Sequence, residues 1–528
     1  MNFLIKILPI FLKFLIHVKK YFKFKKISDS ENLILVELNT DKSAMIGLLY
    51  LVNSLQKIHN AKVIVYQARV ALNIYGYIRK KLNLLFHIKQ IFIYRIFGCE
   101  IKTLTQFGNE SYFVKNKHKE LFKLITVKND ISNLRINNIL VGDLFYDTYT
   151  RWNSKPTIDI NSIHFKKKLL EYLREFYHWY DLIEKGSIKS IVVSHPVYNL
   201  AIPLRIAQKF EIPVYIGSIN FLQYFDKDRK HLWESEYRDH YKLLSNEDKI
   251  KALNYSKKKL EIKFNPNDSS TNDSQNSIIQ RDIHWEKLDT FSPIRKKDIF
   301  IKNGKPNVVI LAHCFYDSPH NEGEWIFADF YEWVIHLLKL SQTTHYNWYI
   351  KKHPASVNQK LNDQVIEELV RKYPNVNILE DVNNTELLAD NVSLILTAFG
   401  SAGYEFSYHK VPVILASNSC SYVGYNFAYK PKDVEDFDYA IKNFQNIKFN
   451  YEKKDIYKFY FNQMLTYWNL YPNYQNYKAN PNNNLATDDE IFKQWMGDFS
   501  KEGHNKNLKN VEDFIISKKN QLITSKID

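Results

Sequence analysis

The clearest chemical signal in the sequence is a turn of small residues that follows an apolar segment. The segment SLILTA (393–398) predicts a buried strand, and FGSAGYE follows it. Glu405, at the end of this turn, could accept hydrogen bonds from ribose hydroxyls. The small residues before it would let the backbone approach a ligand while the next helix offers N–H groups to an anion. These small residues are Gly400, Ser401, Ala402 and Gly403.

We predict that this turn binds the phosphate and ribose of a nucleotide. The chain holds only 14 glycines in 528 residues, so two of them in one short turn favour a ligand. The alternative is a tight strand–helix turn in which glycine serves packing alone.

A basic turn ends another predicted strand. The segment NWYIKKHP (347–354) carries Lys351, Lys352 and His353 at its carboxyl end, and ligands of open α/β sheets bind outside that edge. We predict that Lys352 and His353 donate hydrogen bonds to the phosphate of the same ligand. The alternative is a solvated turn that Pro354 ends.

The loop AHCFYDSPHNEGE (312–324) is rich in titratable side chains. Such density is expected of a functional site at the ligand edge of a sheet. Asp317 and His320 are therefore candidates for the base that activates an acceptor hydroxyl. The alternative is a polar surface loop.

A third candidate base lies in LVGDLFYDTYTRW (140–152). Asp143, Asp147 and Arg151 are each four residues apart, so in a helix they would share one face. Asp143 could take a proton from an acceptor hydroxyl. The alternative, at least for Asp147, is an ion pair with Arg151 within the helix.

Several other chemistries lack their motifs. The chain has no G-x-S-x-G elbow, Walker loop, kinase set or G-x-G-x-x-G fingerprint, which argues against serine hydrolases, nucleoside triphosphatases and nicotinamide enzymes. Cys99, Cys314 and Cys420 show no metal-ligand spacing and cannot form a disulfide framework. We expect no metal, no cofactor and a cytoplasmic location.

Apolar strand patterns alternate with helical patterns along most of the chain. One series covers 32–38, 61–67, 190–196 and 212–217, and a second covers 307–313, 347–354, 376–380, 393–398 and 411–417. This alternation predicts an α/β fold with two Rossmann-like domains that face each other across a cleft. The predicted divisions are a membrane-interface segment 1–27, an acceptor domain 28–264, a polar insert 265–300, a nucleotide-sugar domain 301–433 and returning helices with a tail, 434–528.

The net charge of +16 is concentrated at the N-terminus. Residues 1–26 hold seven Lys and no acidic residue, and the other +9 is spread over about 500 residues with acids interleaved. Large apolar side chains with a Lys stripe predict an amphipathic helix on an anionic membrane surface. The alternative is a docking helix that the protein itself covers. Nucleic acid is not an expected partner.

Two long segments resemble a known family. KKHP together with SLILTAFGSAGYEFSYHKVPVIL resembles the capsule and surface polysaccharide biosynthesis glycosyltransferases, including their Kdo-transferase-like group, and VGDLFYDTYTR and AHCFYDSPHNEGEWIFADFYEW are similar to these proteins as well. The resemblance implies a GT-B fold with the nucleotide sugar on the second domain and the acceptor on the first. It implies donor-phosphate contacts for His353, phosphate and ribose contacts for the turn that ends at Glu405, and a catalytic carboxylate at Asp143.

Pattern and resemblance together predict a bacterial glycosyltransferase at the inner face of the cytoplasmic membrane. Its donor would be a nucleotide sugar, with CMP-Kdo first and UDP- or GDP-sugars as alternatives, and its acceptor a lipid-linked or polysaccharide glycan. The alternatives are a polyol-phosphate transferase or sugar-nucleotide epimerase on the same fold, and a non-catalytic assembly or export factor.

Overall fold

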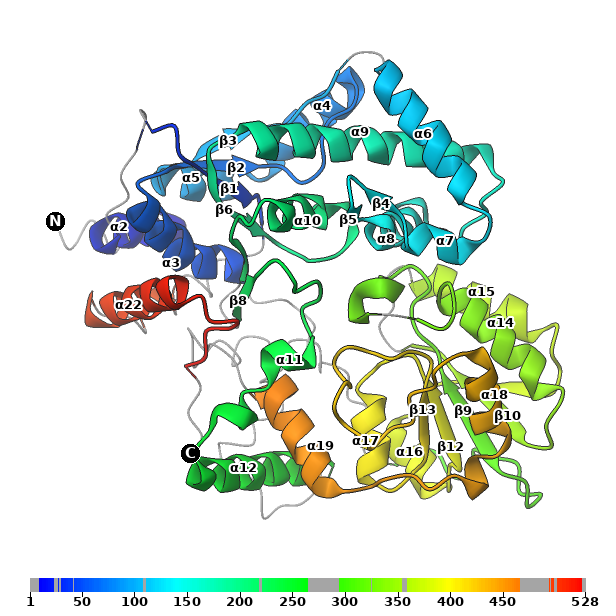
Figure 1. Cartoon of the computed structure of the whole chain (residues 1–528). Coiled ribbons are helices and arrows are strands. Elements are labelled where there is room, and N and C mark those ends of the chain that lie inside the picture. The colour runs from blue at the N-terminus through cyan, green and yellow to red at the C-terminus, as the bar shows by residue number, and fades with distance from the viewer. Residues whose placement is uncertain are drawn as a thin grey trace.

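The computed structural model describes residues 9–22, 27, 30–40, 42–107, 111–217, 221–264, 294–323, 325–353, 359–465, 493, 495–497 and 501–524. They form two α/β domains, which occupy the upper and the lower right parts of Figure 1. The predicted insert is outside this description from 265 to 293.

The first sheet has six strands in the order β3-β2-β1-β6-β7-β8, and β8 alone is antiparallel to its neighbour. Alternation along β1 sends Leu35 to one face of the sheet and Ile34 and Val36 to the other, and both faces are buried. Near-continuous apolar strands are typical of parallel sheets covered on both sides. The strands are β1 (Leu33–Glu37), β2 (Lys62–Tyr66), β3 (Glu100–Lys102), β6 (Ile188–Val193), β7 (Val214–Gly217) and β8 (Leu222–Phe225).

The second sheet has five parallel strands in the order β11-β10-β9-β12-β13. Its central strand β9 is paired in register with β10 and β12 on its two sides. The strands are β9 (Asn307–Leu311), β10 (Asn347–Lys351), β11 (Val376–Leu379), β12 (Leu394–Thr397) and β13 (Val413–Leu415).

Helices cover both faces of each sheet. In the first domain they are α3 (Lys42–His59), α4 (Ile74–Phe86), α5 (Ile88–Ile96), α6 (Tyr112–Leu124), α7 (Lys128–Ser132), α8 (Gly142–Asn153), α9 (Ile163–Lys185) and α10 (Ile202–Lys209), with the small hairpin β4 (Arg135–Ile136) and β5 (Ile139–Leu140) before α8. In the second they are α14 (Phe330–Ser341), α15 (Gln359–Val370), α16 (Asn384–Ala389), α17 (Ala402–Tyr408) and α18 (Val434–Lys442).

The two domains exchange helices near the chain ends. Helix α12 (Asn246–Phe264), which precedes the insert, packs Ala252 and Leu260 into the core of the second domain with α19 (Lys453–Tyr460). Helix α22 (Lys501–Ser517) packs Val511 and Phe514 against α3 in the first domain. A short helix, α11 (Ser235–Arg238), lies on the connection between the domains.

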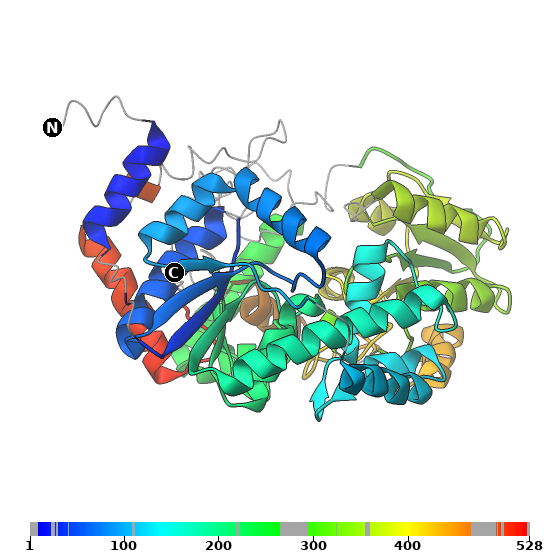
Figure 2. The same ribbon diagram turned by 90° about the horizontal axis from the view of Figure 1, so that it is seen from above.

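The N-terminal segment contains helix α2 (Ile10–Tyr21), and the predicted residues 1–8 lie outside the described ones. The apolar face of α2 is partly covered by the protein, because Phe14, Val18 and Phe22 are buried beside Trp495. Figure 2 shows α2, in dark blue, alongside the red α22. Among the described helices, none has the length and apolarity needed to span a bilayer.

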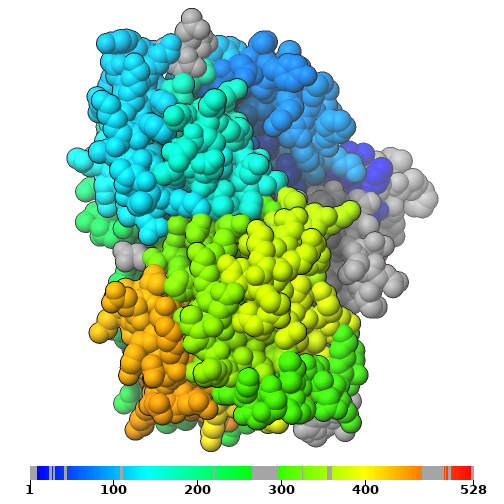
Figure 3. All heavy atoms as spheres, turned by 90° about the vertical axis from the view of Figure 1, so that its right-hand side faces the viewer, coloured from blue at the N-terminus to red at the C-terminus, as the bar shows by residue number. Residues whose placement is uncertain are grey.

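The predicted fold class is confirmed: the protein is α/β, with two Rossmann-like domains that each hold a mainly parallel sheet between layers of helices. Figure 3 shows them in contact, the blue and cyan first domain above the green to orange second domain. In each sheet the chain first adds strands on one side of its first strand and later adds strands on the other side. The direction changes between β1 and β6 in the first sheet and between β9 and β12 in the second. Ligands of such sheets bind outside the carboxyl ends of these strand pairs, where the winding direction reverses.

Candidate functional site

The carboxyl edges of the two sheets meet at Tyr198 and Asp317. Tyr198 follows β6 in the first domain, and its hydroxyl donates a 2.7 Å hydrogen bond to Asp317 Oδ1, from the loop after β9. Arg151 Nη1 lies 3.9 Å from the same oxygen. The Asp317 side chain is 41% exposed, so solvent reaches part of it.

The charge state of Asp317 suits a base. Burial acts to raise the pKa of its carboxyl, but the hydrogen bond from Tyr198 and the charge of Arg151 hold that pKa below its usual value. Burial and the neighbouring Asp317 raise the pKa of Tyr198, so its hydroxyl stays protonated and donates. The Asp317 carboxylate is therefore ionised at neutral pH and can accept a proton directly.

His320 holds the domains together instead of facing solvent. It lies in the 3₁₀ turn Pro319–Glu322, and its Nδ1 is 2.7 Å from Asp147 Oδ1 on α8. Burial lowers the pKa of His320, but the Asp147 carboxylate outweighs it and raises that pKa above its usual value. Asp147 thus pairs across the domain boundary, and Arg151, its predicted partner within the helix, lies beside Asp317.

Further polar contacts connect the two domains at the N-terminus of α14. Asp329, which caps the N-terminus of α14, accepts bonds from Tyr146 of α8 at 2.5 Å and Thr157 at 2.6 Å. Lys128 of α7 pairs with Glu332 of α14. Helices α7 and α8 of the first domain are therefore fixed to the start of α14.

Asp143 lies inside the first domain. It is 7% exposed, and its Oδ2 accepts a 2.9 Å bond from the buried Arg205 on α10. Of the three predicted bases, Asp317 is thus the one with a substantially exposed side chain, while Asp143 and His320 each have a buried charged partner.

Three strand ends of the second sheet converge on His313. This ring follows β9 and stacks on Phe330, with centroids 4.4 Å apart, and it lies 5.4 Å from the ring of His353 after β10. Phe399, which precedes the predicted glycine turn after β12, is 5.2 Å away. Burial and His353 lower the pKa of His313, and its Nδ1 is buried with no hydrogen-bond partner among the residues that the structure describes. The predicted His353 and glycine turn therefore lie around one neutral histidine.

The two glycines of the turn have different surroundings. A Cβ on Gly403 would lie 2.4 Å from the hydroxyl of Tyr422, which donates a 2.8 Å bond to the carbonyl of Gly400. Close packing accounts for Gly403, as the alternative for this turn proposed. A Cβ on Gly400 would meet nothing nearer than Thr397 Oγ1 at 3.6 Å. Ser401 is exposed, whereas Ala402 is buried at the start of α17.

Glu405 is buried under the turn with two partners. Lys263, from α12, places its Nζ 3.0 Å from Glu405 Oε1, and Asn384 donates to Oε2 at 3.3 Å. Lys351 donates a 2.8 Å bond to Asn384 Oδ1. Burial lowers the pKa of Lys351 to about 8, although the negative charge of Glu405 acts to raise it. Lys352 turns to other partners, with Glu367 and Glu380 both 2.8 Å from its Nζ.

The first domain also has an aromatic surface, around Trp152, that the sequence did not predict. Trp152 is 47% exposed, and the guanidinium carbon of Arg69 lies 3.8 Å from the centroid of a Trp152 ring. The guanidinium carbon of Arg151 lies 5.7 Å from the centroid of the Tyr198 ring. The available signal was the place of Arg69 just after the strand at 61–67, the predicted ligand edge.

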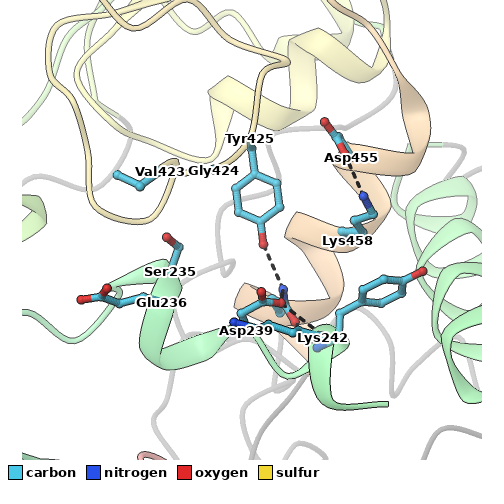
Figure 4. Close-up of a pocket in the computed structure, with 11 residues that line it drawn as sticks. Ser235, Glu236, Asp239, Lys242, Val423, Gly424, Tyr425, Asp455 and Lys458 are labelled. Carbon is cyan, nitrogen blue, oxygen red and sulfur yellow. Dashed lines mark hydrogen bonds and ion pairs between the residues drawn. The ribbon is translucent and has the colours of Figure 1, made fainter. Parts of the chain in front are cut away.

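A separate pocket of about 340 Å³ lies on the connection between the domains. Figure 4 shows it between the α11 region and α19, with Asp239, Lys242 and Tyr425 among its lining. No predicted site residue lines it. Within the part of the chain that the structure describes, no three His, Cys, Asp or Glu side chains are arranged to hold a metal ion.

Comparison with known proteins gives distant structural likenesses alone. No protein-family profile and no curated protein sequence matches the chain. Among solved structures, the KpsC β-Kdo 2,4-transferase of Thermosulfurimonas dismutans is 11% identical, with 52% of this chain and 79% of that chain covered and a TM-score of 0.30. The UDP-GlcNAc 2-epimerase of Neisseria meningitidis is 11% identical over 81% and 95%, with a TM-score of 0.23. A glycosyltransferase of Rickettsia africae is 12% identical over 92% and 99%, with a TM-score of 0.24.

Proposed function

We propose that the protein is a GT-B glycosyltransferase that moves a sugar from a nucleotide-sugar donor to a bacterial capsule or surface polysaccharide. The observation that carries this proposal is the meeting of Asp317 with Tyr198, which joins the ligand-binding edges of both sheets. A donor on one sheet and an acceptor on the other would then approach the same carboxylate.

The donor's phosphate would lie over the second sheet, beside His313, His353 and the Gly400 end of the glycine turn. The unpaired Nδ1 of His313 and the space above Gly400 support this position. Donors already in place there would stabilise the departing phosphate. We propose that this replaces a metal, and that the nucleotide is CMP, UDP or GDP. Glu405 and Lys351 lie behind the turn, where Lys263 and Asn384 hold the Glu405 carboxylate.

The acceptor would lie on the first domain, with its hydroxyl at Asp317. Asp317 would take the proton of that hydroxyl as it attacks the anomeric carbon, while Tyr198 and Arg151 hold the carboxylate in position. The exposed ring of Trp152 offers a flat apolar surface for a sugar ring, as aromatic side chains do in many ligand sites.

We also propose that the protein associates with the inner face of the cytoplasmic membrane, where a lipid-linked acceptor is accessible. Lys19 and Lys20 support this, since they stay exposed on α2 while Phe14 and Val18 are covered. Contact with anionic lipid through residues 1–26 would then rest on the basic side of this helix.

The proposal is tested by incubating the full chain with a panel of CMP-, UDP- and GDP-sugars, with and without a membrane fraction as acceptor source. Release of free nucleotide that requires the acceptor is the expected result. Conversion of the nucleotide sugar without acceptor would instead identify an epimerase. Inactivity on every donor, with polysaccharide production unaffected by Asp317→Asn in cells, would favour the non-catalytic assembly factor.

The neighbouring lysines provide a matched pair for the donor side. Lys351→Ala should weaken nucleotide binding, because it removes the cation beside Asn384 and Glu405. Lys352→Ala removes an ammonium held by Glu367 and Glu380. A larger loss with Lys352→Ala would place the phosphate on the outer lysine, as the sequence predicted.

A further inference from the structure

Helices α4 and α5 present a large apolar surface that the described part of the chain leaves exposed. None of the α4 side chains is buried. Ile74, Ile78, Leu82 and Leu85 recur along one stripe of the helix and are between 50% and 66% exposed, and Phe86 is 85% exposed. A helix on the surface of a globular domain normally turns such a stripe to the core.

The surface continues onto two neighbouring helices. Ile88 and Phe92 are exposed on α5, and Leu12 and Ile16 are exposed on α2. Helices α2 and α5 are in contact, since Lys89 of α5 lies 5.9 Å from the ring of Phe11. We call this surface, formed by the exposed apolar residues of α2, α4 and α5, the α4–α5 face.

The α4–α5 face carries positive charge and no negative charge of its own. Residues 42–99 contain nine Lys or Arg and no Asp or Glu. Arg79, Lys81, Lys89 and Arg95 are exposed among the apolar side chains of α4 and α5. Large exposed apolar areas on a monomer mark interaction sites, and a basic rim selects an anionic partner.

Helix α4 is nonetheless anchored firmly enough to serve as a docking element. Asn73 caps its N-terminus by accepting a bond from the amide of Gly76. The half-buried ammonium of Lys80 donates to the carbonyls of Ala68 and Arg69, just after β2. The helix is thus held by polar contacts on its inner side while its apolar stripe stays outside.

We propose that the α4–α5 face binds the surface of an anionic lipid bilayer. Apolar side chains that enter the acyl boundary, with Lys and Arg at the headgroups, are the pattern of a helix that lies in a membrane interface. Helix α2, with its exposed Lys19 and Lys20, adjoins α5, so it would contact the same bilayer. The proposal is independent of the transfer chemistry, because it concerns a different surface.

Vesicle flotation of the full chain tests it. Wild type should float with vesicles of phosphatidylcholine and phosphatidylglycerol, and much less with phosphatidylcholine alone or at high salt. Leu82→Glu/Phe86→Glu should lower the partition coefficient at least about tenfold, because it places charge in the acyl boundary. Ile163→Glu/Ile250→Glu is the matched control, since it changes two exposed apolar residues on other helices, and it should bind as wild type.

Both double variants replace exposed side chains, so their thermal unfolding should match wild type, which separates loss of binding from loss of folding. Unchanged flotation of Leu82→Glu/Phe86→Glu would overturn the proposal. So would a wild-type dimer in sedimentation that this variant converts to monomer, because the face would then be an interface between two copies of the chain.

Discussion

The Tyr198 hydroxyl and the Asp317 carboxylate join the two domains at the edge where each sheet can bind a ligand. Their hydrogen bond is 2.7 Å long, and it links the segment after β6 to the loop after β9. Because β6 and β9 each belong to the strand pair at which the winding of their sheet reverses, this contact marks the position where donor and acceptor would meet.

Asp317→Asn should reduce sugar transfer by about 100-fold or more, the usual contribution of a positioned general base. The amide keeps the shape of the side chain and can still accept from Tyr198, so nucleotide binding should be retained. Steady-state nucleotide release and binding by calorimetry measure the two effects separately. Asp228→Asn, which changes an exposed carboxylate paired with Lys227, serves as control. An active Asp317→Asn variant would exclude Asp317 as the base.

Asp143→Ala should destabilise the first domain by about 3–5 kcal/mol, because it leaves the buried guanidinium of Arg205 without its carboxylate. Denaturant unfolding measures this. Asp143→Leu combined with Arg205→Met should recover much of the loss, since no charge then remains buried. If Asp143→Ala abolishes transfer while stability is unchanged, Asp143 has the catalytic role that the family resemblance implied.

The pair of His320 and Asp147 should make the domain contact weaken as the pH rises. The folded protein raises the pKa of His320 above its unfolded value of 6.5. The stabilisation from protonated His320 is therefore present at pH 6.5 and is lost as the pH rises through the higher folded pKa. Below pH about 6 the Asp147 carboxylate also takes up a proton, because burial raises its pKa to about 6. His320→Gln should flatten the dependence of unfolding free energy on pH between about 6 and 8. A wild-type stability that increases over this range would contradict the assignment.

Substitutions at the two glycines of the turn should affect stability and nucleotide binding differently. Gly403→Ala forces a Cβ against Tyr422 and should cost about 1–3 kcal/mol of stability. Gly400→Ala has room for its Cβ, so it should leave the unfolding free energy unchanged while it weakens nucleotide binding. Equal loss of stability in both variants would mean that the turn is structural throughout.

The strands were predictable because each parallel strand is an apolar run bounded by turn residues, and all five predicted strands of the second domain are present. The partners of the site residues were not predictable in this way. Arg205 lies 62 residues from Asp143, and Lys263 lies 142 residues before Glu405, so nothing local in the sequence links them. Tyr198 adopts a positive φ of 59° that no motif signals.

The exchange of helices has a similar cause. The apolar faces of α12 and α22 show that each helix must be buried, but they do not specify which sheet it covers. In the structure α12 joins the second core and α22 the first, so that the chain crosses between the domains more than once. Likewise, the apolar N-terminal segment allowed a helix that the protein itself covers, but it did not specify that the C-terminal part of the chain would cover Phe14 and Val18.

The central claim is that the second sheet holds a nucleotide beside His313 and His353. Thermal unfolding of the full chain with CMP, UDP, GDP and their sugars tests it directly, because a nucleotide that binds the folded state alone raises Tm. We predict that one nucleotide raises Tm at concentrations above its Kd, and that His353→Ala removes the shift. Unchanged Tm with every nucleotide, or an undiminished shift in His353→Ala, would contradict the account.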